Sequence, residues 1–284
     1  MKRLILLFFI SFNFLYAQDD LMDLISSNQN QTEYVSYLFK GTKIVNSHSV
    51  EMPSEKVLQF MIQHRFGTLS SGFYELYGLD NAQVRISFDY GVNQWMSFGL
   101  GRSSAIKTFD VNSKIRLKRQ SKGYNSFPFT IATNSAIFIK KYTYQEMQLS
   151  SFDFINQLSY ANQLLIARKV NRSFTFQVTP TIVHHNLIKD QDYQHDKYSI
   201  GLGIRNKISN RISFNAEHFI QLNQNEKTNV LSLGFDIETG GHVFQLHFSN
   251  SSAMIESEFI SNTDGSWTNG DIYFGFNLSR VFNL

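Results

Sequence analysis

Two adjacent histidines come closest to catalytic chemistry in this sequence. His184 and His185 occur in the stretch "TPTIVHHNLIKD". A hydrolase acting on lipid would need a histidine base, a serine nucleophile and a polar group that orients the histidine. Neighbouring residues on a strand point to opposite faces, so each face would receive one histidine, and no serine lies at a fixed nearby offset. The pair is more typical of the rim of a sheet, so no catalytic residue is predicted. A lipid enzyme with His185 or His184 as general base is the alternative.

Metal and cofactor sites are not predicted. His242 and His247 are five residues apart on a predicted strand, and therefore face opposite sides. The chain has no cysteine, which excludes disulfides, thiolate metal sites and a cysteine nucleophile. The glycines of "GLGRSS" at 99–104 do not have the spacing of a nucleotide-binding loop. We expect neither a metal nor a cofactor.

A set of charged residues shares the less apolar face of the predicted strands. If the strands close into a barrel, these side chains point into a narrow lumen and must be paired there. Arg85 and Asp89 are four residues apart on one face, about 13 Å, so they need partners on adjacent strands. The set is either a salt-bridge network that closes the lumen or a constriction that selects solutes by charge. It comprises Arg65, Arg85, Asp89, Lys114, Arg116, Arg205, Glu217 and Asp236.

The elements that would carry these residues are strands, because hydrophobicity alternates with a period of two from about Lys56 onward. Aromatic residues make up 15% of the chain and it has three prolines, a composition that favours pleated sheets. The predicted segments are longer than sandwich strands and suit a tilted membrane crossing. The predicted fold is an all-β transmembrane antiparallel up-and-down barrel of about 12 strands. These strands span 55–66, 82–91, 94–103, 106–118, 125–139, 152–169, 172–187, 196–208, 211–223, 227–238, 242–258 and 268–282.

The connections between the predicted strands are unequal in length. Tight turns rich in Asn and Gly alternate with longer stretches, an asymmetry that places the short turns on the periplasmic side of an outer-membrane barrel. The long stretch containing "GFYELYGLDN" is expected to pack on the rim or to cap the lumen. The tight turns lie at 91–93, 170–172, 209–211 and 239–241, and the longer connections at 67–81, 140–151, 187–196 and 260–270.

The N-terminal part divides into two predicted segments ahead of a barrel domain at 55–284. Residues 1–17 have the charged and apolar regions of a cleaved signal peptide, which implies export to the outer membrane. Residues 18–54 are predicted to form a short helix and a polar link, and act as a plug or an extra strand. A thirteenth strand would put the termini on opposite sides, so we place residues 43–52 in the lumen, at its rim or on the periplasmic side.

The C-terminal segment has the pattern of a membrane-facing strand that closes the barrel. Phe274, Phe276 and Leu278 share the lipid face, and Phe282 lies where an aromatic girdle is expected. The ending resembles the signal read by barrel-assembly machinery, except that two residues follow Phe282. The expected partners are outer-membrane lipid and this machinery. Without Lys2 and Arg3 the charges nearly balance, so nucleic acid is not expected.

Several of these stretches together carry a family resemblance. The chain resembles an uncharacterised family of outer-membrane β-barrel proteins from Bacteroidota, a domain of unknown function. The resemblance implies a barrel fold and an outer-membrane location, and it supplies no catalytic residues. The resembling stretches are "HRFG" at 64–67, "GLDNAQVRISFDYG" at 78–91, "GLGRSS" at 99–104, "LLIARK" at 164–169, "GHVFQLHFSNS" at 241–251 and "GDIYFGFNLSRVF" at 270–282.

The predicted function is that of an integral outer-membrane barrel. It would be a narrow pore or transport component, or a membrane scaffold with a closed lumen. The alternatives are a barrel enzyme acting on membrane lipid and a structural protein that binds partners through its outer loops.

Overall fold

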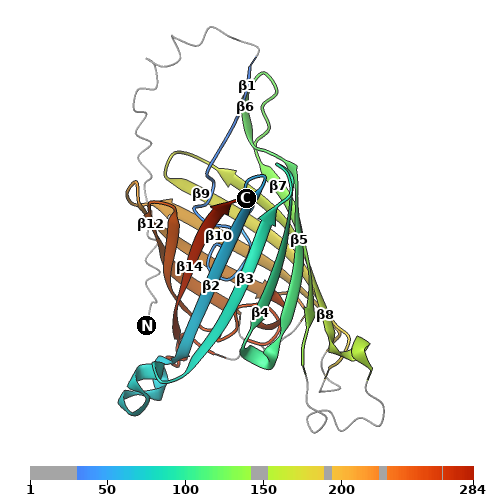
Figure 1. Cartoon of the computed structure of the whole chain (residues 1–284). Coiled ribbons are helices and arrows are strands. Elements are labelled where there is room, and N and C mark those ends of the chain that lie inside the picture. The colour runs from blue at the N-terminus through green and yellow to red at the C-terminus, as the bar shows by residue number, and fades with distance from the viewer. Residues whose placement is uncertain (1–30, 142–152, 189–193, 224–228, 264) are drawn as a thin grey trace, which may run out of the picture.

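The computed structural model describes residues 31–141, 153–188, 194–223, 229–263 and 265–284. Twelve antiparallel strands form a closed barrel, and successive barrel strands along the chain are neighbours in the sheet (Figure 1). This confirms the predicted up-and-down barrel. Its strands are β2 (Val57–Thr68), β3 (Ala82–Gly91), β4 (Met96–Ser103), β5 (Phe109–Lys118), β7 (Thr130–Ile139), β8 (Leu158–Lys169), β9 (Phe174–His185), β10 (Asp196–Lys207), β11 (Ile212–Gln221), β12 (Val230–Thr239), β13 (His242–Ser249) and β14 (Tyr273–Asn283).

The last strand closes the barrel against the first. β14 pairs antiparallel with β2, with Leu278 opposite Ile62 and Phe282 opposite Leu58. The ring of Phe276 stacks on that of His64 with centroids 5.0 Å apart, and Phe274 stacks on Phe66 at 5.6 Å. Closure leaves neither strand with an unpaired edge in the barrel wall.

The barrel has an apolar outside and a polar inside. On β3, the outward side chains of Ile86 and Phe88 are 44% and 46% exposed, while the inward Arg85 and Ser87 are buried. A soluble β-sandwich would bury its large apolar side chains, so this inversion is that of a barrel whose outer face meets lipid. Among the described residues, no helix is long and apolar enough to cross a membrane.

The two ends of the barrel differ, as the connection lengths predict. The tight turns between β3 and β4, β8 and β9, β10 and β11, and β12 and β13 lie at the end that holds the C-terminus, here called the short-turn end. A small sheet of β1 (Thr32–Tyr34) and β6 (Ser121–Gly123) stands above this end in Figure 1. The opposite end, the long-loop end, has the 3-10 helices η1 (Leu69–Ser71), η2 (Phe73–Gly78), η3 (Ala105–Lys107) and η4 (Phe154–Gln157).

Several strand boundaries differ from the prediction, most clearly after β13. The predicted strand 242–258 ends at Ser249, and the chain then turns inward to the short helix α3 (Glu256–Phe259). The side chain of Asn250 holds the chain at this turn by bonding the backbones of Leu231, Asn229 and Gly265. The predicted strand 125–139 begins instead at Thr130, because the preceding connection carries β6. The helix expected within 18–42 falls partly outside the described residues, and residues 32–34 are the strand β1.

The outward face makes a specific prediction about stability. Leu100 points outward from β4 and is 60% exposed, whereas Leu79 is exposed on the connection at the long-loop end. Leu100→Arg should lower the free energy of unfolding in bilayers by up to about 2–4 kcal/mol, the value for an arginine at the bilayer midplane, because a guanidinium in contact with lipid loses its hydration. Unfolding by denaturant in lipid vesicles measures this change. Leu79→Arg is the control, and an equal loss in both variants would contradict a lipid-facing position for Leu100.

Candidate functional site

The lumen is occupied by the segment that connects β1 to β2. This plug segment, residues 37–53, enters and leaves at the short-turn end (Figure 1). Its middle part is almost wholly buried: Leu38, Phe39, Ile44, Val45 and Val50 are each at most 3% exposed. The structure therefore places residues 43–52 within the barrel, and they do not add a strand to its wall.

The tip of the plug segment is a tight turn held by one carboxylate. The turn is closed by a hydrogen bond from Ile44 N to Ser47 O of 2.9 Å. The side chain of Glu217, on β11, accepts from the backbone N–H of Asn46 at 2.8 Å and of Ser47 at 3.0 Å, and from Ser47 Oγ at 2.8 Å. Val45 N donates to the same carboxylate at 3.3 Å. A carboxylate that accepts several N–H groups in a dry site makes strong, charge-assisted bonds.

The carbonyl groups of the plug segment are matched by donors from the wall. The amides of Gln245 and Asn277 donate to Ile44 O at 3.1 Å and to Val45 O at 3.0 Å. Lys114 Nζ donates to Ser49 O at 2.9 Å and to Glu51 O at 2.8 Å. Side chains of the barrel thus satisfy a buried backbone that forms no sheet with the wall, as burial of peptide groups requires.

An apolar contact adds to these polar bonds. Leu38, Phe39, Ile44 and Val50 cluster with Ala132, Leu165 and Ala167 of β7 and β8. On β10, two strands from β8 in the wall, Gly203 has no side chain, and a Cβ there would overlap Ile44 Cδ1. The plug segment is therefore held by shape as well as by hydrogen bonds.

A second segment closes the lumen from the long-loop end. Residues from Met254 to Ile260, including α3, are buried, and Phe259 packs edge-on against Phe219 with centroids 5.4 Å apart. Glu256 meets the plug segment directly, since its Oε1 lies 2.7 Å from Lys43 Nζ and 3.5 Å from His48 Nε2. Burial, followed by the charge of Lys43, lowers the pKa of His48 well below its usual value.

Most of the predicted lumen charges contact the plug segment. Arg65 Nη2 donates to Asn46 Oδ1 at 2.6 Å, and Arg205 Nη1 to Leu38 O at 3.2 Å. Glu217 and Lys114 bind the tip and the carbonyls described above, and Arg116 faces Glu51. All eight lie on the inward face, where six are buried and Asp89 and Arg116 are partly exposed.

Two of the remaining three predicted charges pair within the wall. Arg85 forms a two-pronged ion pair with Asp110 of β5, with Nη2 to Oδ2 at 2.5 Å and Nε to Oδ1 at 3.0 Å. The partner therefore lies on another strand, as the spacing of Arg85 and Asp89 requires. Asp236 accepts from Gln245 Nε2 at 2.7 Å, which holds the amide that binds Ile44 O. Asp89 lies beside Gly99, whose missing Cβ makes room for it.

Several residues of this network were not predicted from the sequence. Asp110 is on the same face as Lys114 and could have been found by its parity on the strand. Glu256 pairs with Lys43, and Glu258 with Lys140. These two could not have been found, because the predicted strand at 242–258 includes them, whereas the chain leaves the wall after Ser249. Lys43 and His48 belong to a segment without regular periodicity, so no pattern indicated their partners.

The histidine pair divides between the two faces as expected. His185 points into the lumen and is buried, and His184 is outside, with Nδ1 2.7 Å from Asp196 Oδ1. A serine does approach His185: Ser159, its register partner on β8, has Oγ 3.0 Å from Nδ1. Lys140 Nζ lies 3.4 Å from the same nitrogen, and both Ser159 and His185 are buried in the lumen, away from lipid. Within the described residues no group of three metal-binding side chains occurs.

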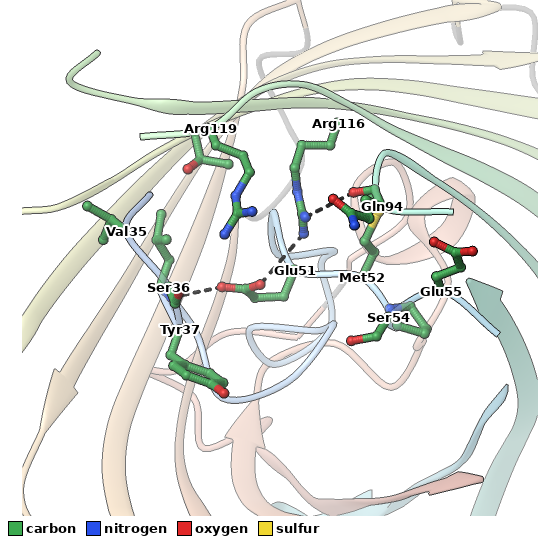
Figure 2. Close-up of a pocket in the computed structure, with 13 residues that line it drawn as sticks. Val35, Ser36, Tyr37, Glu51, Met52, Ser54, Glu55, Gln94, Arg116 and Arg119 are labelled. Carbon is green, nitrogen blue, oxygen red and sulfur yellow. Dashed lines mark hydrogen bonds and ion pairs between the residues drawn. The ribbon is translucent and has the colours of Figure 1, made fainter. Parts of the chain in front are cut away.

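A cavity of about 470 Å³ opens beside the plug segment at the short-turn end (Figure 2). Arg116 and Arg119 point into it from the end of β5, opposite Glu51 of the plug segment. The Nη2 atom of Arg116 lies 3.8 Å from Glu51 Oε2, and its Nη1 donates to Gln94 O at 3.2 Å.

Comparisons with known proteins agree on a membrane barrel. The family model described as "Membrane bound beta barrel domain (DUF5777)" matches residues 39–282. The structure resembles that of the NanC porin, with a TM-score of 0.50 and 8% identity over 80% of this chain and 99% of that one. It also resembles the KdgM porin, with a TM-score of 0.47 and 7% identity over 80% of this chain and 99% of that one. An active-site mutant of outer membrane phospholipase A from Escherichia coli gives a TM-score of 0.45 and 10% identity over 84% of this chain and 95% of that one. At these identities the likeness concerns the fold alone. No curated protein matches the sequence.

The space left by Gly203 allows the packing of the plug segment to be tested. Gly203→Val should push Ile44 away and expose the plug segment to protease, because the added side chain occupies the place of Ile44 Cδ1. Ile44→Ala in the same chain should restore much of the protection by removing the overlapping atoms. Limited proteolysis in detergent, followed by mass spectrometry, measures cleavage between residues 37 and 53. Equal protection in all three proteins would show that Ile44 does not contact Gly203.

Proposed function

Since the chain belongs to the family of membrane-bound β-barrel domains designated DUF5777, we propose that it is a gated outer-membrane pore. In the state seen here the plug segment keeps it closed, and a small solute passes when this segment leaves the lumen. The observation that carries the proposal is that the Glu217 carboxylate binds the turn at 44–47 inside the polar lumen of the barrel. A freely open pore would not have this arrangement.

The character of the contacts supports a plug segment that can leave. Apart from the cluster around Leu165, the wall holds it through Arg, Lys, Glu, Gln and Asn side chains, which water can solvate in its absence. A hydrogen bond exchanged for one to water changes the free energy by only about 0.5–1.5 kcal/mol. A barrel sealed permanently would be more stable with an apolar lumen, because burying ion pairs carries a large desolvation cost.

The predicted export signal and the asymmetry of the two ends support an outer-membrane location. Residues 1–17 have the composition of a cleaved signal peptide, and the short turns of outer-membrane barrels face the periplasm. The plug segment would then enter from the periplasm, within reach of periplasmic partners. The strand β14, with Phe274, Phe276, Leu278 and Phe282, would be read by the barrel-assembly machinery and would face outer-membrane lipid.

A closed scaffold is the second candidate, and the fold of α3 favours it. The helix α3, which includes Glu256, fills the lumen near the long-loop end. Removal of the plug segment alone would therefore leave part of the lumen occupied. The lipid-enzyme alternative has less support, because Ser159 and His185 face the lumen and His185 Nδ1 is shared with Lys140.

The gated-pore proposal predicts how conductance and accessibility change together. Glu217→Ala removes the acceptor of the turn at 44–47, so the purified protein in planar bilayers should show discrete openings that the natural protein rarely shows. The chain has no cysteine, so Val45→Cys introduces a unique thiol into a buried position. A membrane-impermeant maleimide should label it slowly in the natural background and at least about tenfold faster with Glu217→Ala.

Val92→Cys provides the control, because Val92 is 40% exposed in a turn at the same end and should be labelled in both backgrounds. If Val45→Cys becomes reactive while conductance stays absent, the plug segment moves but the protein is a scaffold. If Glu217→Ala changes neither readout, Glu217 does not hold the closed state.

A further inference from the structure

Two arginines and two glutamates border the cavity at the short-turn end, but only one of the glutamates pairs with an arginine. Arg116 and Arg119 project into it from one wall, and Glu51 faces them from the plug segment (Figure 2). Glu55 also borders the cavity, but pairs with neither arginine in the described structure. Two guanidinium groups thus share a single facing carboxylate.

The pair between Arg116 and Glu51 is loose. Its 3.8 Å separation exceeds the 2.7–2.9 Å of a good charge-assisted hydrogen bond. The other oxygen of Glu51 is engaged, since Oε1 accepts from Leu38 N at 2.8 Å. The Nε atom of Arg116 is buried and finds no hydrogen-bond partner among the described residues. Arg116 therefore has donors left for a better-placed acceptor.

Arg119 is also held in a way that leaves its donors free. Its guanidinium lies over the ring of Tyr34, 4.8 Å from the centroid, and in the described part of the chain it forms no ion pair. A ring beneath a guanidinium fixes the plane of the group while its N–H edge stays open. The two arginines present adjoining donor edges of the kind that planar oxyanions bind.

We infer that this cavity binds a small organic anion through a carboxylate group, held by Arg116 and Arg119. Glu51 shows that the cavity accepts a carboxylate, and a free ligand could adopt the close geometry that the backbone of the plug segment denies to Glu51. A volume of about 470 Å³ lies within the range of small-molecule sites. Gln94, Ser36 and Ser54 add polar groups for the remainder of the ligand.

A neighbouring cavity supplies a reporter for binding. It has a volume of about 620 Å³, shares Gln94, Arg116 and Arg119 with the first, and is bordered by Trp95 and Phe127. Trp95 should therefore respond to occupation of the arginines. Trp267, the second tryptophan, bonds Leu231 O and lies away from both cavities, so Trp267→Phe isolates the signal of Trp95.

Binding to this site also bears on the plug segment. A ligand that takes Arg116 from Glu51 removes one contact at the point where the plug segment leaves the lumen. Only this last step rests on the proposed gated pore; the binding itself does not.

The test is a fluorescence titration of the full-length protein in detergent with succinate, inorganic phosphate and chloride at constant ionic strength. Succinate should bind with saturation, and phosphate more weakly. Arg119→Gln should weaken succinate binding about tenfold or more, because it removes a charge-assisted hydrogen bond to the carboxylate. Arg211→Gln is the matched control, because it removes the same charge from an exposed turn at the same end. Calorimetry on the protein with both tryptophans repeats the measurement if Trp267→Phe does not fold.

Glu51→Gln separates an anion site from a cation site. The amide can still accept from Leu38 N, but no longer competes for Arg116, so succinate should bind more tightly. Weaker binding in Glu51→Gln, equal effects of Arg119→Gln and Arg211→Gln, or a response to succinate no larger than that to chloride would each overturn the inference. Saturable binding in a protein that never conducts would leave this site standing and refute the pore.

Discussion

The hydrogen bonds between Glu217 and the turn at 44–47 are the interaction on which the closed lumen depends. A peptide chain buried in a barrel must find partners for its N–H and C=O groups, since an unsatisfied group costs about 1–3 kcal/mol. The plug segment forms no sheet with the wall, so side chains must serve instead. One carboxylate accepts at the tip, while Gln245, Asn277 and Lys114 donate to the carbonyls behind it. The polar lumen and the plug segment therefore complement each other.

This complementarity also explains why the inward face is polar without being an open channel. Its charged groups have close partners: Arg85 pairs with Asp110, and Lys43 pairs with Glu256. The guanidinium of Arg65 donates to the uncharged Asn46 side chain and Ser251 carbonyl. If the plug segment leaves, water can solvate the charged and polar side chains that remain on the wall, which an apolar lining would not allow. The same wall can thus support a closed state and a hydrated one, and the loosely paired Arg116 lies where the two would begin to differ.

The wall of the barrel was predictable from sequence, whereas the path and the partners of the segments inside it were not. Alternation in segments such as 82–91 reports directly which side chains face lipid, because a strand has a period of two and each face meets a different solvent. The inward position of Arg85 or Glu217 follows from that parity alone. Their partners do not, since Lys43, Asn46 and Glu256 lie on irregular segments whose path is set by tertiary contacts. The Ser159–His185 contact was missed for a related reason: it depends on the register between two strands.

Amide hydrogen exchange at Asn46 and Ser47 tests the central claim most directly. If Glu217 holds the turn at 44–47 inside the barrel, these two amides should exchange slowly, with protection comparable to amides of the barrel strands. They should become fast-exchanging in Glu217→Ala while strand amides of β8 and β9 keep their protection. Exchange of Asn46 and Ser47 in the natural protein as fast as that of Gln94, an exposed residue of the turn between β3 and β4, would contradict a lumen closed by the plug segment.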